Sequence, residues 1–131
     1  RGDFRWRRKN VLMLIYDAPT IGDNAVSGNP DRAATAIMHD APDVRLVAFR
    51  LNAGQEVPMH SSTSTVILSV IHGTGVISGP IDGTVQDREV GVGTIVAYEP
   101  DELHGMRAMN EVFVVIATIT PRPGGRMTAA A

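Results

Sequence analysis

The chain contains no cysteine, so neither a disulfide framework nor a thiolate metal site can form in it. The lack of cysteine is compatible with a reducing compartment, and we expect a cytoplasmic protein. No apolar run approaches the roughly 20 residues that a membrane span requires, so we expect no membrane partner. Helical periodicity longer than two turns is also absent, which disfavours a helical fold.

Neither sign of charge is in large excess. The 131 residues carry a formal net charge of -2, so no overall field attracts nucleic acid, and we expect no nucleic-acid partner. The first ten residues, "RGDFRWRRKN", are an exception because they hold five of the twelve basic residues. An arm that contacts an acidic surface is one interpretation of this segment. We favour a solvated tail, because ten residues make a small binding footprint.

The length and composition predict a single domain. Hydrophobic residues make up 44% of the chain and charged residues 20%, an ordinary balance for a globular protein, and the length suits one domain. We expect an N-terminal arm and loop over residues 1–32, in which the apolar run 11–16 forms a buried strand or begins a short helix. We expect a frayed tail over residues 122–131.

Short β-branched segments fill residues 33–121, and Gly, Pro, Asp or Asn separates each from the next. They cover residues 33–39, 44–51, 64–71, 75–78, 84–90, 94–99, 104–109 and 111–120. Many short strands with turns between them predict an all-β sandwich or barrel. The segments "LVAFRL" and "VFVVIATI" are almost continuously apolar, as expected for strands that are covered on both faces.

Histidine is scarce, and two of the four histidines occur in matching contexts. His60 follows "AGQEVPM" and His104 follows "EPDEL", each at the expected entry to a strand. If both strands belong to one small barrel, the two imidazoles can point inward and meet near the same end. Such a pair suits either metal ligation or polar contact with a ligand.

The residues around these histidines resemble the two motifs of the cupin family. The first motif reads G-x5-H-x-H-x3-E-x6-G, and Gly54, His60 and Gly73 fall on it without a gap. The second reads G-x5-P-x-G-x2-H-x3-N, and Gly93 and His104 fit it. The resemblance covers residues 44–120 and implies a cupin double-stranded β-helix, an antiparallel jelly-roll barrel. It also implies a homodimer, which many small cupins form.

The departures from the family motifs concern the metal ligands. In metal-binding cupins the first motif supplies two histidines and a glutamate, and the second supplies one histidine. Carried over by position, the ligands would be His60, Ser62, Val66 and His104. A neutral serine hydroxyl is a poor ligand and valine is none, so only His60 and His104 remain for a divalent transition metal.

The residues that replace the ligands predict a pocket. Strand parity places Ser62 on the face of His60 and Met106 on the face of His104, and Val66 occupies an inward position of the family. We therefore expect a pocket for a small organic molecule, lined by His60, Ser62, Val66, His104 and Met106. The hydroxyl run "SSTST" has an equally good interpretation as an exposed strand with high β-propensity.

Two classes of function follow and both stay open. The first is a non-catalytic small-molecule binding or sensing barrel with a degenerate metal site, and without a confident cofactor. The second is a metal-dependent cupin enzyme, an oxygenase or isomerase, that uses His60 and His104. The missing carboxylate at Val66 favours the first class.

Overall fold

The computed structural model describes residues 13–123. The basic segment 1–10 and most of the expected tail 122–131 lie outside the described residues. Within them, no helix is long and apolar enough to cross a membrane.

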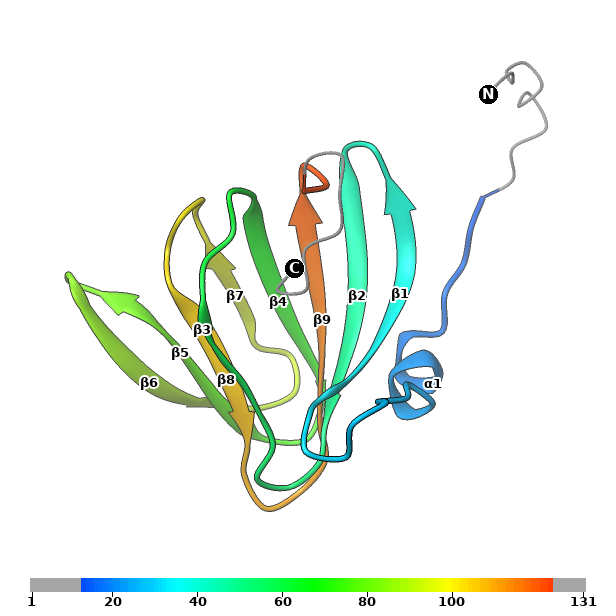
Figure 1. The fold of residues 1–131 in the computed structure, drawn as a ribbon, viewed down its shortest axis with the longest axis horizontal. Helices are drawn as coiled ribbons and strands as arrows, with labels where there is room; N and C mark the ends of the chain where they lie inside the picture. The colour runs from blue at the N-terminus through cyan, green and yellow to red at the C-terminus, as the bar shows by residue number, and fades with distance from the viewer. Residues whose placement is uncertain (1–12, 124–131) are drawn as a thin grey trace.

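Within residues 13–123, nine strands form two antiparallel sheets (Figure 1). The five-stranded sheet has the order β1-β2-β9-β4-β7, and the four-stranded sheet has the order β3-β8-β5-β6. The strands are β1 (Ala34–Ala41), β2 (Val44–Leu51), β3 (Glu56–His60), β4 (Thr65–His72), β5 (Gly75–Ile81), β6 (Thr84–Val90), β7 (Ile95–Tyr98), β8 (His104–Ala108) and β9 (Phe113–Thr120). The prediction of an all-β, antiparallel fold is confirmed. The strands of the described residues run from Ala34 to Thr120, and the limits 33–121 for the barrel stay a prediction.

One apolar core fills the space between the sheets. Alternate residues of β2, β4 and β9 supply most of it, as the period of two in a strand requires. Phe113, Val115 and Ile119 of β9 are fully buried, and Ile77 and Met106 reach the same cluster from the four-stranded sheet. The outward residues Val114 and Ile116 are buried as well, whereas Thr118 and Thr120 are half-buried, so the first half of β9 is covered on both faces.

The sequence did not predict β3. Its residues alternate poorly and include Pro58, and most of them are exposed. Proline lacks the N–H of a ladder and is therefore tolerated in an edge strand, which is the position of β3 in its sheet. A register shift between Val57 and His60 marks an irregularity in its pairing with β8.

The structure also differs from the prediction before β1. Residues 13–16 form no buried strand, and Met13, Leu14 and Ile15 are 81%, 60% and 79% exposed. A short helix, α1 (Ala18–Asp23), follows in the expected loop, and the side chain of Asp17 caps it by accepting the N–H of Thr20. Over residues 13–16 neither predicted alternative, a buried strand or the start of a short helix, is present, because apolarity alone does not say which surface covers a segment; residues 11–12 lie outside the described residues.

Gly75 packs so closely on the core that a larger side chain should destabilise the fold. A Cβ atom at this position would lie 2.6 Å from the ring of Phe113, which is itself fully buried. We expect Gly75→Ala to lower the free energy of unfolding by about 1–3 kcal/mol through overpacking. Gly28→Ala is the matched control, because nothing lies within 4 Å of its Cβ position. Urea denaturation measures both, and equal effects of the two variants would contradict the packing argument.

Candidate functional site

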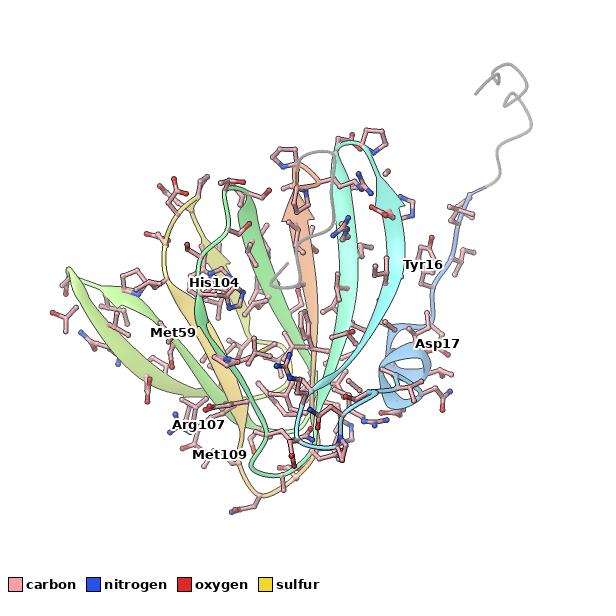
Figure 2. All side chains as sticks on the ribbon, viewed as in Figure 1. Tyr16, Asp17, Met59, His104, Arg107 and Met109 are labelled. Atoms are coloured by element: carbon pink, nitrogen blue, oxygen red, sulfur yellow. The ribbon has the colours of Figure 1, made fainter. Side chains whose placement is uncertain are left out.

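The pairing of β3 with β8 brings the two predicted histidines together. His60 is the last residue of β3, His104 is the first of β8, and the two are direct cross-strand partners. Their ring centroids are 4.3 Å apart at an interplanar angle of 62°, and Figure 2 shows His104 beside β3, at the end of β8. The expected convergence of the two imidazoles is therefore present.

A backbone carbonyl fixes the orientation of each ring. His60 Nδ1 lies 2.8 Å from the oxygen of Pro58, and His104 Nδ1 lies 3.0 Å from the oxygen of Glu102. A carbonyl oxygen only accepts, so each Nδ1 carries the ring proton and donates it. Each Nε2 is then a bare acceptor, and both Nε2 atoms are buried without a hydrogen-bond partner.

A small cavity lies beside the two rings. It has a volume of about 10 Å³, and its walls come from both sheets. The lining residues are Phe49, Val57, His60, Val66, Leu68, His104, Gly105, Met106 and Ala117. Such a volume holds about one water molecule. The site therefore has room for one atom beside the rings, and the bulk of an organic ligand would have to lie outside the cavity.

The cavity includes most of the predicted pocket residues but not Ser62. Val66 and Met106 line it, together with the two histidines. The parity argument failed for Ser62 because β3 ends at His60. The hydroxyl of Ser62 instead accepts the N–H of Ser64, and its carbonyl oxygen accepts the N–H of Asp101. Sequence reasoning also missed Val57, because the register shift in β3 puts Val57 and His60 on one face.

Tyr98 is a second residue that sequence reasoning missed. Its ring centroid lies 4.7 Å from that of His104, and its hydroxyl donates to the oxygen of Ser78 at 2.8 Å. Burial, with a smaller effect from the charge of Glu102, raises the pKa of Tyr98 to about 12. Tyr98 is the cross-strand partner of Val66, which occupies the glutamate position of the first cupin motif. Knowledge of the pairing of β4 with β7 would therefore have placed Tyr98 next to the site.

The electrostatic surroundings keep His104 uncharged at neutral pH. Burial is the main cause that lowers its pKa below the ordinary 6.5, and the nearby His60 acts in the same direction. The hydrogen bond to Glu102 opposes this effect but does not cancel it. The ring of His104 is thus a neutral acceptor.

The donor set does not fit a four-ligand cupin metal centre. Within residues 13–123, no group of three or more His, Cys, Asp or Glu residues could hold a metal ion. Val66 presents a hydrocarbon wall where the family places its glutamate, and the hydroxyl of Ser62 is bonded to the backbone instead. Two imidazole nitrogens are the available ligands, whereas a structural zinc site usually has four protein ligands.

Comparisons with known proteins identify the fold. No protein-family model and no curated protein matches the chain. An uncharacterized protein with a double-stranded β-helix domain from Klebsiella pneumoniae has 20% identity and a TM-score of 0.71, over 87% of this chain and 95% of that one. An RmlC-like cupin from Desulfovibrio desulfuricans has 25% identity and a TM-score of 0.68, over 84% of this chain and 98% of that one. The protein has the cupin fold.

An enzyme is also among the solved structures that share this architecture. The DMSP lyase DddQ from Ruegeria pomeroyi has 17% identity and a TM-score of 0.64, over 88% of this chain and 57% of that one. Identities this low establish the fold of the chain and leave its chemistry to be argued from its own site. The resemblance to cupins that the two sequence motifs indicated is confirmed.

The lowered pKa of His104 predicts how stability depends on pH. Below pH 6.5 the unfolded chain takes up a proton at His104 more readily than the folded chain does. The free energy of unfolding should therefore fall as the pH drops from about 6.5 towards 5, and this loss should end below the folded pKa. Urea denaturation at several pH values between 5 and 8 gives the free energy of unfolding as a function of pH. This free energy should change less with pH for His104→Gln than for the wild type.

The acidic groups do not obscure this test. The pKa values of Asp40 and Asp87 are lowered from 3.8, chiefly by hydrogen bonds from Arg122 and Ser78 respectively. Their contributions to stability therefore change at more acidic pH than the window of the measurement. If the free energy of unfolding changed equally with pH in the wild type and in His104→Gln, the pH dependence could not be assigned to His104.

Proposed function

We propose that this cupin is a non-catalytic small-molecule binding barrel in which His60 and His104 together accept hydrogen bonds from one donor group. The observation that carries the proposal is the pair of buried Nε2 atoms without a partner. An unsatisfied buried acceptor costs about 1–3 kcal/mol. Two such atoms beside one cavity therefore favour any group that can donate to both.

The size and lining of the cavity limit the donor group. About 10 Å³ admits one heavy atom, and only an atom that carries two hydrogens, such as the nitrogen of a primary amide, can donate to both imidazoles. Phe49, Leu68 and Met106 surround it with apolar surface, which penalises a fully charged group. The ligand is therefore a neutral organic molecule that inserts a primary amide nitrogen with its two N–H groups. His60 is only partly buried, and the body of the ligand lies on its side of the barrel.

A metal-dependent enzyme is the second candidate, and the same two nitrogens favour it. An imidazole whose Nδ1–H donates to a carbonyl presents Nε2 in the state that a metal requires. The DMSP lyase among the similar structures is an enzyme with this fold. The apolar side chain of Val66 in place of a carboxylate is the reason that we rank this candidate second.

A homodimer and a cytoplasmic location remain part of the proposal. Three consecutive apolar residues before α1, Met13, Leu14 and Ile15, are largely exposed. Contiguous exposed apolar surface of this kind is typical of interaction sites, which supports association with a second copy. The lack of cysteine supports a reducing compartment.

Histidine-selective NMR separates the two candidates. Long-range ¹H–¹⁵N spectra of the full chain should show both rings protonated at Nδ1. Butyramide should shift the Nε2 signals of both His60 and His104, and 1-butanol should have a smaller effect because its hydroxyl has only one hydrogen to donate. The exposed His72 is an internal control that should not respond. Stoichiometric transition metal in the purified protein, or Nε2 signals that respond to zinc but to neither organic probe, would support the enzyme instead.

Restoring the missing carboxylate should create a metal-dependent protein. Val66→Glu places a carboxylate on the wall of the cavity that contains both imidazoles. The buried glutamate should destabilise the apo form, and a bound cation should offset that loss. We expect nickel or zinc to raise the melting temperature of Val66→Glu by at least about 5 °C, roughly 1 kcal/mol in a domain of this size. His104→Gln added to Val66→Glu should abolish the response, and equal responses of the two would contradict the site.

A further inference from the structure

A second and larger cavity lies on the other side of Tyr98. It occupies the space between the edge strands β6 and β7, where the two sheets are not joined by hydrogen bonds. Its volume is about 260 Å³, close to the lower end of the roughly 300–1,000 Å³ found for small-molecule sites. Figure 1 shows the β5–β6 hairpin projecting away from β7 at this side of the barrel. We call this cavity the β6–β7 cleft.

The lining of the β6–β7 cleft is mainly apolar. Its hydrocarbon wall consists of Ile77, Pro80, Ile81, Val90, Val96 and Ala97. Tyr98 closes its inner end, because this residue lines the cleft and also stacks on His104. Gly79 leaves the space that the Tyr98 ring occupies, since a Cβ at Gly79 would lie 2.5 Å from the ring. Tyr98 therefore separates the cleft from the cavity beside the imidazoles.

Strand alternation gives the cleft its polar groups. In β6, Gln86 and Arg88 line the cleft, while Asp87 pairs with Ser78 and Arg107 on the opposite face of the sheet. Glu102, which follows β7, also lines the cleft. One cationic and one acidic side chain therefore border an otherwise apolar space.

Arg88 and Arg50 differ from the other arginines of the barrel, because each donates to a backbone oxygen and has no carboxylate partner within residues 13–123. Arg45 and Arg122 both pair with Asp40, and Arg107 pairs with Asp87. Arg88 donates to the backbone oxygen of Asp87, and within residues 13–123 it has no carboxylate partner. Its guanidinium retains N–H groups that can bind a carboxylate in two places.

Glu102 favours one orientation of a ligand in the cleft. Its carboxylate accepts the N–H of Glu99 at 2.8 Å, and its negative charge contributes to the raised pKa of Tyr98. An anionic group would be repelled from this end and attracted to Arg88 on β6. An apolar body would then lie along the hydrocarbon wall between them.

We propose that the β6–β7 cleft binds a small amphipathic carboxylate, with Arg88 as the partner of the carboxylate and the apolar wall around its hydrocarbon chain. The proposal goes beyond the binding function assigned to His60 and His104, because neither histidine lines the cleft. Tyr98 separates the two cavities, so the proposal for each cavity can be tested independently of the other.

Titration with hexanoate, 1-hexanol and hexylamine tests the proposal, with chemical shifts of the full chain as the readout. We expect hexanoate to bind more tightly than either other probe and to shift the amides of β6 and β7. Arg88→Gln should weaken hexanoate about threefold to fivefold, the range for an exposed ion pair. Arg107→Gln removes the same charge from the other face of the sheet and should leave the affinity unchanged.

A pair of adjacent substitutions tests the location. Gln86→Trp fills the cleft from β6 and should abolish the hexanoate response, whereas Val85→Trp adds the same ring at a neighbouring exposed position outside the cleft and should not. Lack of hexanoate binding, or equal affinity for hexanoate and 1-hexanol with no effect of Arg88→Gln, would overturn the proposal. Loss of hexanoate binding in His60→Gln would assign the ligand to the imidazole cavity and also overturn it.

Discussion

The candidate site depends on two hydrogen bonds between imidazoles and backbone carbonyls. The Nδ1 of each ring is bound by the carbonyl two residues earlier, that of Pro58 for His60 and that of Glu102 for His104. These bonds select the tautomer and the direction of both rings at once. Because His60 and His104 are direct cross-strand partners in the pairing of β3 with β8, the Nε2 atoms of both rings lie beside one cavity. Neither ring could turn its Nε2 to solvent without breaking the hydrogen bond from its Nδ1 to the backbone carbonyl.

The sequence predicted the fold and the pairing of the histidines because both depend on local patterns. Gly54 and Gly93, which open the two motifs, have φ values of 80° and 94°, a region that glycine enters without strain. The turn before His104 is formed even where this sequence departs from the motif. Asp101 occupies the glycine position and adopts a φ of 71°, as aspartate does more readily than most residues. The backbone of the turn is therefore kept although its sequence is not.

The rest of the site could not be predicted because it depends on where strands end and which edges meet. Ser62 was assigned to the wall on the assumption that the strand continues past His60, and it does not. The position of Tyr98 follows from its pairing with Val66 across β4 and β7, a contact between segments that are distant in the sequence. The cleft beside β6 likewise follows from the absence of hydrogen bonds between two sheet edges, which no periodicity reports.

The contrast between two polar clusters supports the proposal that the imidazole pair is the functional site of this cupin-fold chain. Arg45 is 1% exposed, yet it pairs with Asp40, which also binds Arg122, so a structural role is sufficient for that cluster. His60 and His104 are different, because each leaves a buried acceptor without a partner. Two apolar side chains of similar shape would fill the same space without that cost, since removing both unsatisfied groups is neutral or stabilising. Buried polar atoms are normally hydrogen-bonded, and exceptions that do not stabilise the fold are expected at functional sites. The imidazole pair is such an exception, and the hydrocarbon surface of Val66 beside it supports the proposal of a neutral donor over a four-ligand metal ion.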